Sequence, residues 1–353
     1  MNLKKHRKKI DSLDRKLVQV LNERAQESLA IGKEKMKSRK GIYAPDREKE
    51  VMTKISLLNK GPMSEEALSA IYREIMSSSL SLEKSLQIAY LGTEGSFTHL
   101  AACKKFGSQV TYISCNSILE IFQKVEHTDC DYGVVPIENS TEGAVTHTFD
   151  LLVDSDLKIC AQILLKVTHH LLSNTSVEKI RKIYSNPQVF GQCRNWLLEN
   201  MPHAGQIWVP STTQAAQIAA KEKNTAAIAS LRAAEIYRLR AVKRNIQDIV
   251  HNTTRFLILA RQDVPLTGHD RTSIVFSIKD KVGALHAMLK PFYKNKINLT
   301  KIESRPSKRK AWDYYFFVDF EGHREDRKVQ KALSELEDMC KYLRILGSYP
   351  DVK

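Results

Sequence analysis

The sequence predicts a multidomain protein: an all-α domain, then an α/β domain, then an α+β domain. The chain has 353 residues, more than the roughly 100–200 of one domain. Residues 3–86 show helical spacing without any strand pattern, whereas 87–262 alternate short apolar runs with helical stretches. Residues 271–350 follow the order βαββαβ, which is the ferredoxin-like arrangement. The expected domains are therefore 1–86, 87–262 and 271–350, with a linker at 263–270.

Composition limits the class of protein. Apolar residues make up 42% and charged residues 27% of the chain, which is ordinary for a globular protein and excludes disordered and fibrous classes. No apolar run approaches the ~18–20 residues of a membrane span, and the basic start lacks the apolar stretch of a secretory signal. The six cysteines form no Cys-x-x-Cys pair. We therefore expect a cytoplasmic protein with reduced thiols and no membrane contact.

The positive charge is concentrated at the amino terminus. The net charge is +15, and residues 1–40 hold 13 Lys or Arg against 5 Asp or Glu. Such a segment can neutralise nucleic-acid phosphates, gather a small polyanionic substrate, or form a solvated helix face. A nucleic-acid binder is an alternative that predicts salt-dependent retention on DNA and no turnover.

The first domain is predicted to contain three helices. Apolar residues recur every three or four positions from Ile10 through Leu13 and Leu17. Gly and Pro interrupt the pattern at 41–45 and at 61–62, and Ser64 can cap the last helix. The expected helices span about 3–39, 46–59 and 64–86.

Cations on the first helix suggest an anion site. A helix turns ~100° per residue, so Arg24 and Lys35, which are 11 residues apart, face the same way. Arg7 lies 17 residues before Arg24, about 100° round the helix. This pattern suits an anion site shared with a neighbouring subunit, although long helices are often basic without binding an anion.

Four motifs occur together in this domain. They are Arg7-Lys-Lys-Ile-Asp-Ser-Leu-Asp, Asn22-Glu-Arg24, Ile31-Gly-Lys-Glu-Lys35 and Asp46-Arg47-Glu48. With them the domain resembles the all-helical chorismate mutase family, an intertwined helical dimer, over its whole length. The resemblance implies rearrangement of chorismate to prephenate without a cofactor or a metal. The substrate-site positions that it implies are Arg7 (supplied across the dimer), Arg24, Lys35, Arg47, Glu48 and Ser79.

The implied reaction needs positioning and electrostatics rather than a nucleophile. The site must fold a dicarboxylate and stabilise charge on the breaking ether oxygen, and Arg side chains suit carboxylates. Glu83 departs from a common family pattern, in which a Gln donates to that oxygen. Glu83 can donate only when protonated, so we expect mutase activity to fall as the pH rises. The alternative is that Glu83 is a solvated residue near its helix end.

The α/β domain opens with a glycine turn after the strand at 88–91. Gly92 and Gly95 permit the turn, and backbone N–H groups with the hydroxyls of Ser96 and Thr98 can hold an anion at the helix that follows. The turn matches neither a Walker loop nor a dinucleotide fingerprint, and many such turns carry Gly for geometry alone. The other strands, in mostly parallel sheets, are expected at 110–113, 132–136, 159–167, 182–184, 225–229 and 254–260, with helices at 98–106 and 117–125.

Four more polar clusters lie at strand ends, at 134–143, 185–193, 211–216 and 252–256. They contain no Ser-His-Asp or Cys-His arrangement, and His169-His170 are interpreted as strand residues rather than metal ligands. Together the clusters closely resemble prephenate dehydratase over the length of the domain, and the triplet Thr254-Arg255-Phe256 is the most specific mark.

The dehydratase resemblance implies two α/β subdomains, like those of periplasmic binding proteins, with the substrate between them. Thr254 would be the catalytic hydroxyl, Asn139, Ser185 and Gln192 would line the site, and Arg255 would lie near the substrate carboxylates. Because prephenate loses CO2 and its ring hydroxyl, the enzyme chiefly needs a proton donor at the departing oxygen. The alternative for Thr254 is a buried hydroxyl bonded to backbone.

The last domain carries two motifs that resemble the phenylalanine-binding motifs of ACT regulatory domains. Gly283-Ala284-Leu285 begins a helix, and Glu303-Ser304-Arg305-Pro306 ends a strand. Backbone amides near Gly283 can bind a carboxylate; the alternative is plain packing and a surface ion pair. The expected strands are 273–278, 297–304, 312–320 and 342–348, and the expected helices are 284–295, with a kink at Pro291, and 325–341.

The three domains, in this order, resemble the family of bifunctional phenylalanine-biosynthesis enzymes. The resemblance implies conversion of chorismate through prephenate to phenylpyruvate, inhibition by L-phenylalanine, a homo-oligomer (dimer or tetramer) and no nucleic-acid partner. An alternative is an amino-acid sensor whose catalytic parts have decayed. The intact triplet at 254–256 and the full set of cations argue against it.

Overall fold

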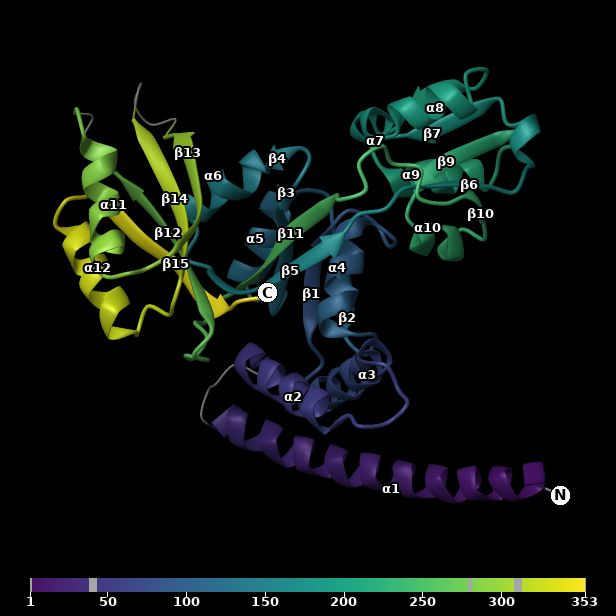
Figure 1. Ribbon diagram of the computed structural model, residues 1–353, viewed down its shortest axis with the longest axis horizontal. Helices are drawn as coiled ribbons and strands as arrows, with labels where there is room; N and C mark the ends of the chain where they lie inside the picture. The colour runs from purple at the N-terminus through teal and green to yellow at the C-terminus, as the bar shows by residue number, and fades with distance from the viewer. Residues whose placement is uncertain (1, 38–42, 279–280, 308–312, 353) are drawn as a thin grey trace. The chain divides into compact units, whose positions relative to one another are not determined.

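The computed structural model describes residues 2–37, 43–278, 281–307 and 313–352. The chain divides into two compact units: residues 1–87 with 105–111, and residues 88–104 with 112–353. Figure 1 labels the helices and strands of both units. Within the described ranges, no helix combines the length and the hydropathy that a membrane span requires.

The first unit contains the three predicted helices. The Ser64 hydroxyl accepts a hydrogen bond from the Ala67 amide at 3.2 Å and so caps the third helix, as predicted. This helix ends at Glu83, earlier than expected, because the chain is already extended at Lys84. The predicted end of the first helix, at Arg39, falls outside the described residues. The helices are α1 (Asn2–Lys37), α2 (Pro45–Leu58) and α3 (Glu65–Glu83).

The amino-terminal half of α1 has no packing partner within the described part of its own chain. Residues 3–20 are all exposed, including Ile10, Leu13 and Leu17, which are each more than half exposed. Only the second half of the helix packs against α3. An amphipathic helix normally buries its apolar face, whereas this half leaves its apolar residues exposed in the described part of the chain.

The first sheet of the second unit has the strand order β2-β1-β3-β11-β5, with β4 on β3. Strand β1 pairs with β3 in parallel, whereas β11 is antiparallel to both β3 and β5. The prediction of mostly parallel sheets is therefore wrong, because β11 returns from the second sheet and enters between two strands of the first. The strands are β1 (Gln87–Leu91), β2 (Thr111–Cys115), β3 (Tyr132–Asn139), β4 (Gly143–Ala144), β5 (Lys158–Lys166) and β11 (Thr253–Ala260).

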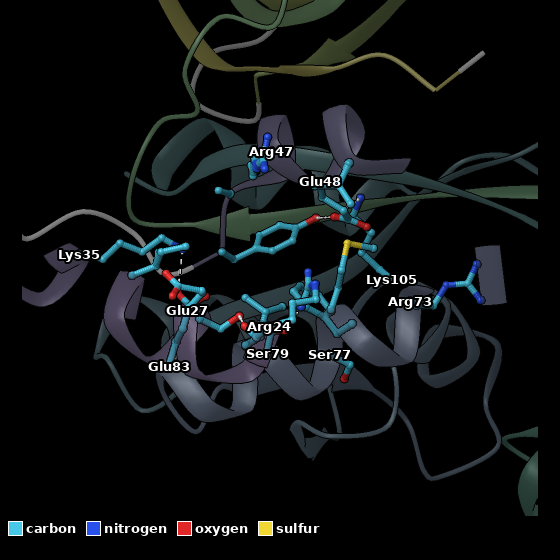
Figure 2. Close-up of a pocket in the computed structure, with 18 residues that line it drawn as sticks. Arg24, Glu27, Lys35, Arg47, Glu48, Arg73, Ser77, Ser79, Glu83 and Lys105 are labelled. Atoms are coloured by element: carbon cyan, nitrogen blue, oxygen red, sulfur yellow. Dashed lines mark hydrogen bonds and ion pairs between the residues drawn. The ribbon is translucent and has the colours of Figure 1, made fainter. Parts of the chain in front are cut away.

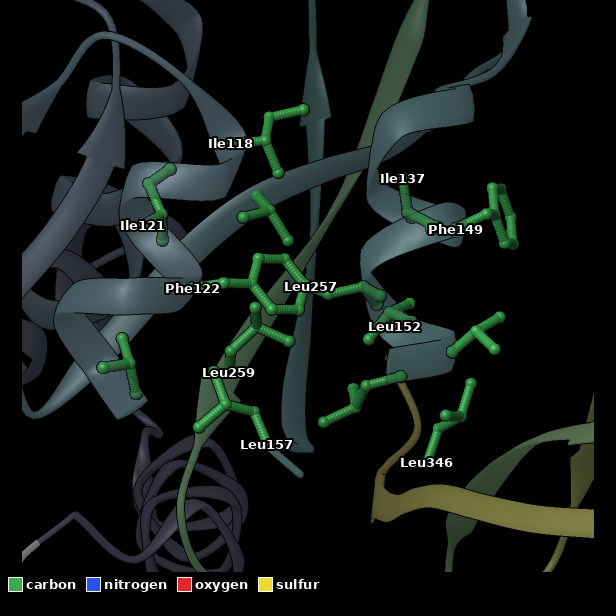
Figure 3. Packing of buried hydrophobic residues seen from close by; sticks show 14 of the residues in the cluster. Ile118, Ile121, Phe122, Ile137, Phe149, Leu152, Leu157, Leu257, Leu259 and Leu346 are labelled. Atoms are coloured by element: carbon green, nitrogen blue, oxygen red, sulfur yellow. The ribbon is translucent and has the colours of Figure 1, made fainter. Parts of the chain in front are cut away.

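Three helices accompany this sheet: α4 (Phe97–Phe106), α5 (Ile118–Glu126) and α6 (Thr146–Asp154). Figure 3 shows the main core, where Phe122 of α5 and Leu152 of α6 meet Leu257 of β11. Leu346, from the third sheet, joins the same cluster. The carboxy-terminal domain is thus anchored to the sheet that carries the triplet at 254–256.

The second sheet has the order β10-β6-β9-β7-β8 and is covered on both faces. Helices α7 and α8 contribute Phe190 and Leu197 to one core, and α9 and α10 contribute Ala216 and Ala233 to another. The short strands β6, β8 and β10 were not predicted, although β6 does begin at His170. The elements are β6 (His170–Ser173), η1 (Val177–Lys179), β7 (Lys182–Ser185), α7 (Pro187–Gln192), α8 (Arg194–Asn200), β8 (Gly205–Trp208), α9 (Thr212–Ala219), β9 (Thr225–Ala229), α10 (Leu231–Ile236) and β10 (Arg240–Lys243).

The third sheet confirms the ferredoxin-like prediction. Its order is β13-β14-β12-β15, all antiparallel, and α11 and α12 lie on one face (Figure 1). A side chain at Gly347 would place Cβ 2.2 Å from the carbonyl oxygen of Ile159, so glycine permits β15 to lie close to β5. The elements are β12 (Asp270–Ser277), α11 (Ala284–Lys294, with Pro291 inside it), β13 (Leu299–Pro306), β14 (Tyr314–Glu321), α12 (Arg327–Glu337) and β15 (Tyr342–Pro350).

Candidate active sites

The first unit encloses a pocket of about 510 Å³ between its helices. Its lining includes five cationic side chains (Arg24, Lys35, Arg47, Arg73 and Lys105) and three carboxylates (Glu27, Glu48 and Glu83). The pocket thus carries an excess of positive charge, which suits an anionic ligand. Six of the predicted site residues line it: Arg24, Lys35, Arg47, Glu48, Ser79 and Glu83.

Helices α1 and α3 pair their polar residues across the pocket. Arg24 donates to the hydroxyl of Ser79, and the Nζ of Lys35 lies 2.8 Å from Oε2 of Glu83. Gly32 permits this approach, because a Cβ there would lie 3.0 Å from the Cα of Glu83. The Glu83 side chain is only 8% exposed, so the alternative of a solvated residue is wrong.

Glu48 is held at the other end of the pocket (Figure 2). Its Oε2 accepts a hydrogen bond from the Tyr43 hydroxyl at 2.8 Å and lies 3.0 Å from the Nζ of Lys105. Sequence reasoning missed both partners. Tyr43 falls in the predicted break between helices, and Lys105 lies beyond the predicted domain.

Two predicted cations stand apart from the pocket interior. The side chain of Arg47 is 61% exposed and pairs with Glu50 at 2.5 Å, so it lies at the rim. Arg7 is exposed on α1 and does not line the pocket of its own chain. Its predicted role across a dimer stays a prediction.

In the second unit, the predicted catalytic hydroxyl lies in a polar cluster. Thr254 on β11 is paired in register with Asn139 on β3. The Nδ2 of Asn139 donates to Oγ1 of Thr254 at 2.7 Å and to Oδ1 of Asn252 at 2.8 Å. Among the described residues, the buried Thr254 hydroxyl bonds to a side chain rather than to backbone. Because it already accepts from an amide, its own proton can be donated to a ligand.

Gln192 extends this cluster through its amide. Its Oε1 accepts from the Nε2 of His169 at 2.8 Å and from Asn252 at 3.1 Å, and its Nε2 donates to Glu142 at 2.9 Å. Burial lowers the pKa of His169, although its bond to Gln192 opposes the shift. A neutral His169 that donates through Nε2 therefore orients the amide of Gln192. The sequence analysis interpreted His169 as a strand residue, but it lies just before β6, which begins at His170. That analysis did not single out Asn252.

The other predicted dehydratase residues have local structural partners. Ser185 is fully buried and donates to the carbonyl of Ile228 at 2.9 Å. Ser96 accepts from the amide of His99 at 3.2 Å and donates to the carbonyl of Leu91 at 3.1 Å, within the glycine turn. Thr98 is buried in the first turn of α4. In the described structure, none of the three hydroxyls bonds to the cluster around Thr254.

Arg255 differs most from its predicted place. Alternate residues of a strand point to opposite faces, and Arg255 points away from Thr254. Its guanidinium donates to Gln162 at 2.8 Å, Asp319 at 2.6 Å and the Tyr349 hydroxyl at 2.9 Å. Asp319 and Tyr349 belong to the third sheet, so the expected contact with substrate carboxylates is replaced by an anchor to the carboxy-terminal domain.

The two predicted phenylalanine motifs lie at the same end of the third sheet. Arg305 pairs with Tyr315, which pairs with Ser277 at the end of β12, shortly before Gly283. Gly283 has φ of 77° and precedes α11, and a Cβ there would meet no atom within 4 Å. The Nε of Arg305 is buried and has no hydrogen-bond partner in the described structure. This end therefore offers an open helix start near an unsatisfied cationic donor.

Three family models match the chain along its length. Chorismate mutase type II matches residues 6–84, prephenate dehydratase matches 88–264 and the ACT domain matches 272–338. A bifunctional chorismate mutase/prephenate dehydratase of Aquifex aeolicus is 49% identical over 99% of this chain and 98% of its own length. The chain belongs to the bifunctional chorismate mutase/prephenate dehydratase family. It is therefore an enzyme of the mutase and dehydratase classes, as predicted.

Solved structures resemble the dehydratase and ACT regions. The prephenate dehydratase of Arthrobacter aurescens, solved in complex with L-Phe, is 31% identical with a TM-score of 0.70, over 75% of this chain and 90% of that one. A structure titled as GqqA, a quorum-quenching acylase, is 28% identical with a TM-score of 0.69, over 75% and 98%. These likenesses support the family's two-subdomain dehydratase fold followed by an ACT domain.

Proposed function

We propose that this chain rearranges chorismate to prephenate in the pocket around Arg24 and converts prephenate to phenylpyruvate at the cluster around Thr254. The observation that carries the proposal is that six predicted mutase residues line one pocket of the first unit, while Thr254, Asn139 and Gln192 belong to one hydrogen-bonded cluster of the second. The deciding test is a coupled assay on the purified chain with chorismate supplied and phenylpyruvate measured. Formation of prephenate without phenylpyruvate would refute the second site, and no turnover at all would favour the decayed sensor.

The mutase pocket needs no general base. Arg24 and Lys35, which face the pocket from one side of α1, can hold the two carboxylates of chorismate in a folded conformer. Their charge also stabilises the negative charge that grows on the ether oxygen as it breaks. Glu83 faces the same region and would oppose that charge if ionised.

We expect Glu83→Gln to flatten the pH dependence of mutase turnover. The Glu83 carboxyl lies 2.8 Å from the Nζ of Lys35 in the pocket. A carboxyl can donate a hydrogen bond only when it is protonated and repels a negative charge when it is ionised, whereas an amide donates at any pH. Wild-type turnover should fall as the pH rises, whereas the Gln variant keeps a neutral donor throughout. The measurement is the mutase rate of both proteins from about pH 5 to 9, with dehydratase turnover as the control. Superimposable profiles would exclude Glu83 from the chemistry.

At the dehydratase site, Thr254 is the proton-donating hydroxyl. Prephenate loses its ring carboxylate as CO2 while its ring hydroxyl leaves as water, and the electron pair of the broken C–C bond completes the aromatic ring. The departing oxygen must take up one proton. Thr254, oriented by Asn139, can donate a hydrogen bond there, while His169 and Gln192 keep the neighbouring amides in place.

Feedback inhibition by L-phenylalanine has a physical route in the second unit. In the pairing of β11 with β3, Arg255 lies opposite Glu138, next to the pair of Thr254 and Asn139. Both Arg255 and Glu138 form ion pairs with residues of the ACT domain. Arg255 pairs with Asp319, and Glu138 lies 2.7 Å from the Nζ of Lys301 on β13. Glu303, of the second phenylalanine motif, lies two positions further along β13. A shift of β13 on ligand binding would therefore act on the strands that carry the catalytic pair.

We predict that L-phenylalanine binds the chain, inhibits the dehydratase step and shifts its oligomeric equilibrium. Calorimetry should show binding at or below millimolar concentration, and no binding there would refute the regulatory assignment. Lys301→Met should leave binding nearly intact but weaken inhibition about tenfold, since allosteric coupling is commonly ~1–3 kcal/mol. Lys294→Met is the matched control, because Lys294 forms a half-exposed pair with Glu335 within the ACT domain. Equal effects of both variants would refute the proposed route.

The exposed half of α1 supports a homodimer. Its apolar residues need a partner, and an apolar groove of about 520 Å³ runs along α1 and α3 past Leu21, Ile71 and Leu82. A second copy of α1 in such an interface would also bring a second Arg7 to the assembly. We further propose a cytoplasmic location, which is supported by the absence of any Cys-x-x-Cys pair among the six cysteines of the sequence.

A further inference from the structure

We infer that Lys105 is a substrate-positioning residue of the mutase site, although it lies beyond the chorismate mutase match at 6–84. Lys105 is the next-to-last residue of α4, and it belongs to the first compact unit with residues 106–111. It lines the same pocket as Arg24 and Glu48. The inference rests on the proposed placement of the mutase site in that pocket.

The contacts of Lys105 are directed at Glu48. Its Nζ lies 3.0 Å from Oε2 of Glu48, and both side chains are only 20% exposed. The same ammonium lies 5.7 Å from the centre of the Tyr43 ring, and the Tyr43 hydroxyl donates to the same oxygen of Glu48. Figure 2 shows Lys105 and Glu48 together at one end of the pocket, away from Lys35 and Glu83.

The segment that follows Lys105 is attached firmly to the mutase helices. Phe106 is buried and packs on Tyr43 with ring centres 5.1 Å apart. The amide of Gln109 donates to the Ser77 hydroxyl at 3.0 Å. Gly107 passes so close that a Cβ would lie 2.5 Å from the Cβ of Ser77, and its φ of 73° also favours glycine. Lys105 therefore enters the pocket from a fixed backbone rather than from a flexible tail.

Lys105 compensates the negative charge that Glu48 brings into the pocket. An uncompensated carboxylate in the pocket would repel a dicarboxylate substrate. Lys105 neutralises it and holds Oε2, and neither described contact of Glu48 uses the other oxygen, Oε1. That oxygen can accept from the one hydroxyl that chorismate carries. Lys105 thus orients Glu48 for the hydroxyl end of the substrate and adds to the positive charge of the pocket.

The test compares Lys105→Met with Lys105→Arg in the full chain. Because the orienting contact exists before and during the reaction, its loss removes binding of substrate and transition state alike. We expect Lys105→Met to raise the mutase KM for chorismate about tenfold with kcat changed less than threefold, and Lys105→Arg to stay within about threefold of wild type. In a Glu48→Gln background, the effect of Lys105→Met should shrink to less than half.

Lys104→Met is the matched control, because it removes the same charge one position earlier, where Nζ bonds the carbonyl of Leu164 at 2.8 Å. Dehydratase turnover reports whether each variant is folded. The inference is overturned if Lys105→Met matches Lys104→Met, if Lys105→Arg loses as much as Lys105→Met, or if Lys105→Met lowers both activities equally. If the pocket is not the mutase site at all, Arg24→Ala will also leave mutase turnover unchanged. That result distinguishes a wrong placement of the mutase site from a wrong role for Lys105.

Discussion

Replacing Thr254 with Ala is expected to lower dehydratase turnover by about 10²–10⁴-fold, the range of a positioned proton donor, and to leave mutase turnover nearly intact. The Thr254 hydroxyl is buried and accepts a hydrogen bond from Asn139. The mutase residues Arg24 and Lys35 belong to the other compact unit. The measurement is the steady-state rate of each step with its own substrate. Thr254→Ser, which keeps a hydroxyl, should retain most of the activity.

Thr253→Ala is the control for this experiment, because it makes the same change on the adjacent residue of β11. It should leave the dehydratase rate within about threefold of wild type, since adjacent strand residues point to opposite faces. Loss of both activities in Thr254→Ala would indicate a folding defect. Loss of neither would remove Thr254 from the chemistry.

The second large effect is expected for Arg24→Ala, which should lower mutase kcat/KM by about 10²–10³-fold, the scale of removing one preorganised donor to a developing charge. Arg24 is held in the pocket by its hydrogen bond to the Ser79 hydroxyl on α3. Arg24→Lys should recover only part of the loss, because an ammonium cannot make the two parallel hydrogen bonds of a guanidinium. The assay follows chorismate consumption.

Lys37→Ala is the control for Arg24→Ala, because it removes one positive charge from the same helix. Lys37 pairs with Glu34 on the exposed side of α1, so its removal should leave mutase kinetics almost unchanged. A similar decrease in both variants would mean that overall charge, not the pocket, governs the rate. Dehydratase turnover should stay at the wild-type level in either case.

Much of the architecture could be predicted from local pattern. Helical periodicity and the cap at Ser64 located α3, because capping and amphipathicity act over a few neighbouring residues. Helix geometry alone predicts that Arg24 and Lys35 lie on the same side of α1. The four-residue strands β8 and β10 escaped prediction because they are mostly exposed and carry little apolar pattern, unlike the buried β7. The short β6 was also missed, and its hydrogen bonds come from strands distant in sequence.

The sequence alone determined the order of the domains and the three helices of the first unit, because periodicity acts over neighbouring residues. It also determined six pocket residues, through the resemblance of its motifs to a known family. The contacts of the Arg255 side chain were not determined by the sequence. Alternation along β11 separates it from Thr254, but only packing decides which face of the strand meets the ACT domain and leaves Arg255 bonded to Asp319 and Tyr349. Lys105 enters the mutase pocket for the same reason: its contact with Glu48 joins positions 57 residues apart in sequence, and only the folded chain brings them together.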